Sequence, residues 1–208
     1  MKILALSDEV VDWIYGPGLL SRCGDIDLVV SCGDLPMHYL EYVASTLNTP
    51  SLYVRGNHDL YEIGEGGAIK TEPEGWINLD GRRKRFGGVT LAGLEGCLRY
   101  KPHVPLQYTQ REQWLRAIWL MRAMLIPLWR GGRGVDILVT HAPPYGIHDA
   151  ADLAHTGFRA FEWLIRAAKP RFHLHGHQHR SYAPMSGHET TVNGTTVINV
   201  HPFRIIDV

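Results

Sequence analysis

Five groups of polar residues stand out because each follows a short apolar run and because together they hold acids, amides and imidazoles. The groups are Ser7-Asp8-Glu9, Cys32-Gly33-Asp34, Gly56-Asn57-His58-Asp59, Thr140-His141-Ala142-Pro143-Pro144 and Gly176-His177-Gln178-His179. Their Asp, Asn and His side chains suit Mn²⁺, Fe²⁺, Zn²⁺ or Co²⁺ better than the all-oxygen shells of Ca²⁺ or Mg²⁺. A carboxylate can bridge two cations about 3.5–4 Å apart, the separation at which a metal pair polarises a phosphoryl group. The pattern predicts a two-metal hydrolase site.

The apolar runs before these groups predict the strands that position them. Continuous apolar runs bounded by Gly, Asp, Asn or His are typical of buried strands. The sequence has such runs at Ile3–Leu6, Leu28–Ser31, Ser51–Val54, Val89–Ala92, Ile137–Thr140 and Phe172–Leu174. Helical patterns lie between several of them, at Met37–Leu47, Thr109–Leu128 and Gly157–Ala168. Strands that alternate with helices predict an α/β fold, in which sites are built at the strand ends.

Capping and turn residues indicate where these elements end. Thr109 and Glu112 have the spacing of a capping box, and Pro170 forbids the last helix to continue. The Asp-Gly and Asn-Gly pairs in 78–81 and 192–195 predict tight hairpins. No internal repeat or linker interrupts the chain, so we expect one domain over residues 1–208.

The same five groups, in this order, resemble the calcineurin-like metallophosphoesterases, whose pattern is D-x-H, G-D, G-N-H-[DE], a lone histidine and G-H-x-H. Four of the five blocks match, and the groups extend from Asp8 to His179. The resemblance implies a four-layer α/β/β/α sandwich of the metallo-dependent phosphatase type, with two mixed sheets flanked by helices. It also implies hydrolysis of a phosphomonoester or phosphodiester by a metal-bound hydroxide at a dinuclear centre.

The resemblance implies a ligand set for two divalent transition-metal ions. Manganese is the first expectation, and iron, zinc, cobalt and nickel are the alternatives. Asp34 would bridge the metals. The first metal would also take Asp8 and His179, and the second would take Asn57, His141 and His177.

The resemblance also implies groups that act on the substrate. His58 resembles the family's general acid or phosphate-binding histidine, which protonates the leaving alkoxide or stabilises charge on the phosphate. Asp59 would orient its ring, and Asn57 together with His58 would contact the substrate. No serine or cysteine is expected to act as a covalent nucleophile.

The chain departs from the family pattern at Val10, where D-x-H requires a histidine. Three alternatives follow. The first metal can retain three protein ligands and water, with lower affinity. Glu9 or Asp12 can replace the missing ligand, or the protein binds one metal or little metal. If the vacancy limits occupancy, Val10→His should tighten the first metal, and an unchanged titration would mean that another group fills it.

Composition limits the other classes of protein. The 208 residues carry 21 basic and 21 acidic side chains, so the zero net charge does not favour a nucleic-acid binder. The Arg82–Arg85 run lacks interleaved aromatics and is typical of a solvated turn. Three cysteines without CxxC spacing fit a reducing compartment, and we find neither a signal-peptide core nor a membrane span. We therefore expect a cytoplasmic protein that does not bind membranes.

We expect a phosphoesterase with a small phosphate-ester substrate. The alternative is a binding or scaffold protein that keeps this fold but has weak or no activity, for which Val10 is the main argument. Excess apolar residues in 109–128 indicate a buried helix, a pocket wall or a homo-oligomer contact. No site role is expected for His38, His148, His155, His173, His175 and His201.

Overall fold

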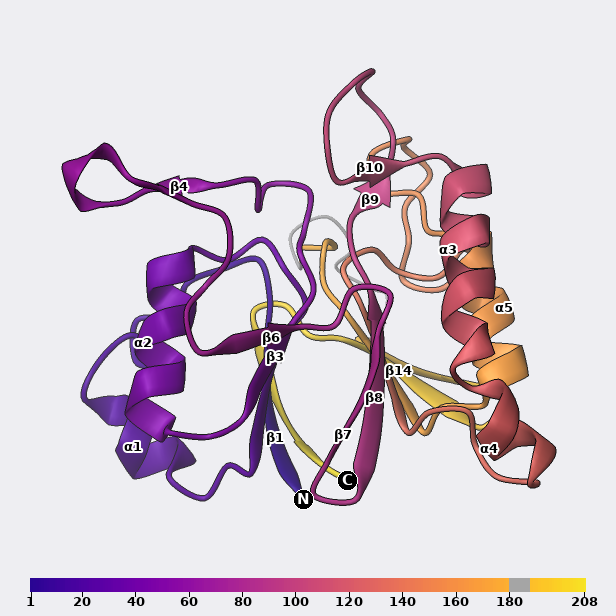
Figure 1. The fold of residues 1–208 in the computed structure, drawn as a ribbon, viewed down its shortest axis with the longest axis horizontal. Helices are drawn as coiled ribbons and strands as arrows, with labels where there is room; N and C mark the ends of the chain where they lie inside the picture. Colours follow the sequence, from indigo (N-terminus) through magenta and orange to yellow (C-terminus); the bar gives the residue numbers. More distant parts are fainter. Residues whose placement is uncertain (180–187) are drawn as a thin grey trace.

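Four layers of secondary structure make up the protein, as the α/β/β/α prediction requires (Figure 1). The computed structural model describes residues 1–179 and 188–208. Helices α1 (Gly18–Cys23) and α2 (Met37–Leu47) cover one outer face, and α3 (Gln110–Arg122) and α5 (Arg159–Ala168) cover the other. The short helix α4 (Leu125–Trp129) follows α3, and η1 (Glu65–Gly67) is a single 3-10 turn.

Two mixed sheets lie between the helical layers. The first has the order β15 (Phe203–Asp207), β1 (Lys2–Leu6), β2 (Leu28–Ser31), β3 (Ser51–Tyr53), β6 (Trp76–Asn78), and β15 alone runs antiparallel to its neighbour. The second has the order β13 (Glu189–Val192), β14 (Thr195–Asn199), β12 (Phe172–His175), β11 (Ile137–Thr140), β8 (Val89–Leu94), β7 (Arg83–Phe86), with both edge strands antiparallel. Two small ribbons pair β4 (Glu62–Ile63) with β5 (Ile69–Lys70) and β9 (Cys97–Leu98) with β10 (Gln107–Tyr108).

Alternation of side chains along the strands builds the three apolar interfaces between these layers. On β1, Ile3 and Ala5 face the second sheet, whereas Leu4 and Leu6 pack with the residues of α1 and α2. On β11, Val139 faces the first sheet and Leu138 packs with α3 and α5. Successive strand residues point to opposite faces, so a fully apolar run is required where a sheet is buried on both sides.

The carboxyl ends of the central strands meet at one edge of the sandwich. β2 and β11 have the predicted bounds, and β1, β3, β8 and β12 differ from the predictions by one or two residues. The predicted polar groups begin directly after β1, β2 and β12, at the last residue of β11 and shortly after β3. Parallel strands therefore deliver the candidate site residues to the same edge.

The predicted helix Thr109–Leu128 is divided, which corrects the sequence analysis. α3 begins with the expected capping box, in which Thr109 accepts from the backbone of Glu112 and Glu112 accepts from that of Thr109. The helix ends at Arg122 and is capped by Ala123, which lies four residues before Pro127, and a proline ring clashes with the carbonyl at that distance. Trp119 of α3 and Trp129 of α4 are 67% and 87% exposed, and a homo-oligomer contact there stays a prediction.

One of the two predicted hairpins is wrong. Val192–Thr195 does join β13 to β14, with Asn193 and Gly194 at positive φ as a tight turn requires. Residues 78–81 instead connect β6 of the first sheet to β7 of the second, and the Asp80 carboxylate accepts from the backbone of Glu95 at 3.0 Å. The hairpin of this region is β7–β8, which turns at Gly87-Gly88 with φ of 52° and 89°.

Across residues 1–179 and 188–208, no helix combines the length and the apolar character that a bilayer span requires.

Candidate metal centre

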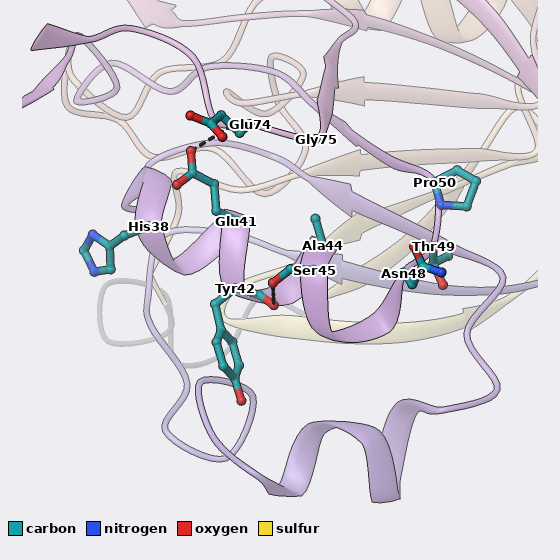
Figure 2. Close-up of a pocket in the computed structure, with 10 residues that line it drawn as sticks. All are labelled: His38, Glu41, Tyr42, Ala44, Ser45, Asn48, Thr49, Pro50, Glu74 and Gly75. Carbon is teal, nitrogen blue, oxygen red and sulfur yellow. Dashed lines mark hydrogen bonds between the residues drawn. The ribbon is translucent and has the colours of Figure 1, made fainter. Parts of the chain in front are cut away.

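The predicted polar groups line a cavity of about 410 Å³ at the common strand edge. Its walls are Asp8, Asp34, Asn57, His58, Tyr100, Ala154, His155, His177 and His179. A larger groove of about 730 Å³ runs along α2, and Figure 2 shows its lining residues. In that groove Glu41 already accepts hydrogen bonds from Lys70 and from the backbone of Glu74. The smaller cavity, which contains most of the predicted ligands, is the candidate site.

Asp34, His141 and His177 form the centre of this cluster. Each presents one nitrogen or oxygen, and these three atoms lie within 4.8 Å of one another. Both histidines are buried, and Nε2 of His141 is 3.4 Å from Oδ2 of Asp34. Asp34 follows β2, His141 follows β11 and His177 lies just beyond β12, so the two sheets contribute jointly.

Both histidines are held by a backbone carbonyl through one ring nitrogen. Nδ1 of His141 lies 2.8 Å from the carbonyl oxygen of Cys32, and Nε2 of His177 lies 2.8 Å from that of Ala154. A carbonyl accepts, so each of these nitrogens donates. The other nitrogen of His141, Nε2, is the one that lies 3.4 Å from Asp34. A backbone carbonyl that accepts from one ring nitrogen is a common way in which metal-ligating histidines are oriented.

Asn57 completes the set predicted for the second metal. Its Oδ1 is 3.2 Å from Nε2 of His141, and its Nδ2 donates to the hydroxyl of Tyr100 at 3.4 Å. The amide is therefore oriented with its oxygen toward His141. All four predicted ligands of the second metal are together.

Burial and charge shift the pKa values of this cluster in opposite directions. Burial alone would raise the pKa of Asp34, but the His141 charge and the hydrogen bonds from His141 and the His58 backbone lower it to about 2. Burial alone would lower the pKa of His141, but the Asp34 charge raises it to about 9. Burial and the His141 charge lower the pKa of His177 to about 3. Positive charge is thus favoured beside Asp34, supplied by either a proton or a metal ion.

Asp8 and His179, predicted for the first metal, lie beside this cluster. Both carboxylate oxygens of Asp8 accept from the backbone N–H of His177, at 3.1 and 2.9 Å. Nε2 of His179 is 3.9 Å from Oδ1 of Asp8, and the His179 side chain is 43% exposed. Burial raises the pKa of Asp8, and the charge of Asp34 adds to that increase. A cation between these two carboxylates would offset their repulsion.

Glycines and left-handed backbone bring the carboxylates close to the chain. Asp8, Asp34 and His177 have φ of 65°, 55° and 66°, a region that non-glycine residues seldom adopt and that is common at functional sites. A side chain at Gly56 would overlap Oδ1 of Asp34, and one at Gly176 would overlap Asp8 and Ser7. The glycines of G-N-H-D and G-H-x-H are therefore required by the packing of the acids.

His58 and Asp59 occupy different environments. The His58 residue is exposed and lines the cavity, while its backbone N–H donates to Oδ1 of Asp34 at 2.8 Å. Oδ2 of Asp59 accepts from the backbone N–H groups of Asp34 and Gly56, at 2.8 and 2.7 Å. Burial and the charge of Asp34 raise the pKa of Asp59 to about 6. Asp59 thus fixes the backbone beneath the ligands, and its predicted effect on the His58 ring stays a prediction.

Two histidines for which no site role was predicted, His155 and His201, lie at the site. The His155 ring packs on the His177 ring with centroids 5.3 Å apart, and no strand-end motif marks it. The His201 ring packs on the His179 ring at 4.6 Å. His201 lies two residues beyond β14, and this position after a strand is the signal that could have identified it.

The donor set fits divalent transition-metal ions. It offers carboxylate oxygens, one amide oxygen and oriented imidazole nitrogens, the ligand types that Mn²⁺, Fe²⁺ and Zn²⁺ accept. Asp34 and Asp8 line the same cavity, and the charge of Asp34 contributes to the raised pKa of Asp8, so Asp34 borders both predicted ligand sets. Its role as a bridging carboxylate stays a prediction.

The sequence model of the calcineurin-like phosphoesterase family matches residues 3–181. Metallophosphoesterase domain-containing protein 1 from Homo sapiens and its counterpart from Mus musculus are each 37% identical over 71 residues. That stretch is 33% of this chain and 22% of each relative, so the match spans about a fifth of their length.

Solved structures share the fold. The crystal structure of TT1561 from Thermus thermophilus has a TM-score of 0.58 at 16% identity, covering 96% of this chain and 88% of that chain. Another crystal structure has a TM-score of 0.61 at 14% identity, covering 96% and 90%. At such identities the likeness concerns the fold alone.

Proposed function

Because the chain belongs to the calcineurin-like phosphoesterase family, we propose that it is a metal-dependent hydrolase of a small phosphomonoester or phosphodiester. One observation supports this proposal above the others. Asp34, His141 and His177 present their ligand atoms within 4.8 Å, and both imidazoles are already oriented by backbone carbonyls. A preorganised set of this kind fits a bound metal better than polar side chains that only satisfy backbone groups of the loops.

Two metals would be held by ligands that share Asp34. Asn57, His141 and His177 would hold the second, and Asp8 and His179 would take part in the first. When bound, such a pair polarises the phosphoryl oxygens and lowers the pKa of a water that then attacks phosphorus. Manganese is the metal we favour for this mixed oxygen and nitrogen set.

His58 would act on the leaving group. Its backbone is fixed to Asp34, and its exposed residue lines the cavity, so the ring can reach a bound ester without belonging to the metal set. In the acid form it would give its proton to the departing alkoxide oxygen. Asn57 would share the contact with the phosphate.

The size of the cavity supports a small substrate. Its volume of about 410 Å³ lies in the range of ordinary ligand pockets, about 300–1,000 Å³. Tyr100 and His155 line the same cavity and would contact the organic part of the ester.

Metal content separates this proposal from that of a scaffold protein without turnover. After loading with Mn²⁺ and desalting, we expect two equivalents of manganese per chain. The Asp34→Asn protein should lose most of that metal. Asp207→Asn is the matched control, because Asp207 pairs with Lys2 at the far end of β1 and should bind as wild type does. A wild-type protein that binds no metal would favour the scaffold.

A further inference from the structure

The C-terminal segment crosses from the second sheet to the first at the edge that carries the site. Strand β14 ends at Asn199, and β15 begins at Phe203, which pairs with Leu6 at the end of β1. The backbone N–H of Ser7 donates to the carbonyl oxygen of Pro202 at 3.0 Å. His201 is therefore held beside the residues that follow β1.

Successive contacts connect His201 to the predicted first metal site. Its buried ring lies on the His179 ring at a centroid distance of 4.6 Å and an angle of 30°, and Nε2 of His179 is 3.9 Å from Asp8. Nε2 of His201 is also 3.4 Å from Oε2 of Glu9, whose side chain is 61% exposed. Asp8, His179, His201 and Glu9 thus form one continuous group.

The backbone at Asp8 explains why Glu9, and not Val10, belongs to this group. The N–H of Glu9 donates to the carbonyl oxygen of Ser7 at 2.8 Å, and φ of Asp8 is 65°, so the chain reverses in a γ-turn immediately after β1. Beyond the turn, Val10 packs against the apolar cluster between the first sheet and its helices. A valine suits that environment, whereas a metal ligand at this position would lie against the apolar cluster instead of at the metal site.

We propose that Glu9, positioned by His201, supplies the ligand that Val10 does not and completes the first metal site. This inference rests on the proposed two-metal function. The carboxylate would bind through oxygen, and His201 would orient it, as a hydrogen-bonding partner orients most carboxylates that bind metals. Compared with the histidine of the family pattern, the Glu9 carboxylate is an anion in place of a neutral imidazole. It would therefore favour metals that accept oxygen ligands, such as Mn²⁺.

A calorimetric titration with Mn²⁺ tests the inference without relying on activity. Glu9→Gln should weaken one of the two bound equivalents by more than tenfold and leave the other unchanged. His201→Phe keeps a flat ring against His179 but removes the nitrogen, and it should weaken the same equivalent by about tenfold. Asp12→Asn is the matched control, because Asp12 is the other exposed acid after β1, and it should titrate as wild type does.

The outcomes separate this inference from the proposed function. Two wild-type affinities in Glu9→Gln would overturn the role of Glu9 while the two-metal centre stands. If Asp12→Asn instead weakens one Mn²⁺ equivalent, the missing ligand is Asp12 and the role of Glu9 is overturned. Fewer than two equivalents in the wild-type protein would overturn the two-metal centre itself, and the inference with it.

Discussion

Nε2 of His141 lies 3.4 Å from Oδ2 of Asp34 in a part of the site where the histidine is fully buried. Burial disfavours the charged forms of both residues, and their mutual attraction offsets that cost. The second nitrogen of His141 is already committed to the carbonyl oxygen of Cys32. A metal ion that binds Asp34 must therefore displace the proton that this pair would otherwise share.

The pair predicts how the stability of the metal-free protein depends on pH. The pKa of His141 is about 9 in the folded protein, above its ordinary value of 6.5, because the Asp34 charge outweighs the effect of burial. The stabilisation is therefore complete below pH 6.5 and is lost as the pH rises toward 9. The pKa of Asp34 is lowered to about 2, so its contribution is constant over this range.

Urea unfolding in EDTA at pH 6, 7.5 and 9 measures this effect. We expect a loss on the order of 2 kcal/mol between the extremes, since one pKa unit corresponds to about 1.4 kcal/mol. His141→Gln should not show this loss. The same decrease in wild type and in His141→Gln would contradict the assignment.

His58→Gln should reduce the rate of hydrolysis most for esters whose leaving group must be protonated as it departs. General acid catalysis contributes about 10²–10⁴-fold, and that loss is expected with phenyl phosphate. The loss should be much smaller with p-nitrophenyl phosphate, because p-nitrophenolate leaves without protonation. Steady-state rates on both esters decide the matter, and equal losses would identify His58 as a phosphate-binding group instead.

Asp59→Ala should disturb the metal site, although we assign Asp59 to no metal. Its carboxylate accepts from the backbone N–H groups of Asp34 and Gly56, and a buried donor without an acceptor costs about 1–3 kcal/mol. Asp59→Asn keeps an oxygen in place and is the matched control. We expect the alanine variant to lose unfolding free energy and Mn²⁺ affinity, and the asparagine variant to retain most of both. Equal behaviour of the two would refute this role.

Val10→His tests the first metal site from the opposite side. Because the half-buried Val10 packs against the apolar cluster and Glu9 is proposed to supply the missing ligand, the Mn²⁺ titration should not change. The variant should lose stability by about 1–3 kcal/mol, since it places a polar ring among apolar side chains. A tighter first equivalent would show that the vacancy is real.

The strand ends could be predicted because an apolar run followed at once by polar residues indicates both the strand and the site residues at its end. Apolar runs buried on both faces gave β2 and β11 their bounds, and the polar residues after them fall where parallel strands end. Asp34 and His141 meet because their strands belong to packed sheets that both direct their carboxyl ends to one edge. No long-range information was required beyond the fold class.

Other features depend on contacts that a local pattern does not contain. Asp80-Gly81 has the residues of a hairpin turn, but the Asp80 carboxylate accepts from the backbone N–H of Glu95, just after β8, and pairs with Arg116 of α3. Whether Glu9 or Val10 lies beside the site depends on the left-handed backbone of one residue, Asp8. His201 approaches the site only because β15 returns antiparallel to β1.

Hydrolysis by the Mn²⁺-loaded wild-type and Asp34→Asn proteins tests whether the Asp34 carboxylate is required for phosphoester cleavage. Bis-p-nitrophenyl phosphate and p-nitrophenyl phosphate serve as the diester and the monoester, and Asp207→Asn is the folded control. We predict release of p-nitrophenol from at least one ester by wild type and by the control, and none above background by Asp34→Asn. Undiminished hydrolysis by Asp34→Asn would contradict the claim that this carboxylate is the centre of a metal-dependent phosphoesterase site.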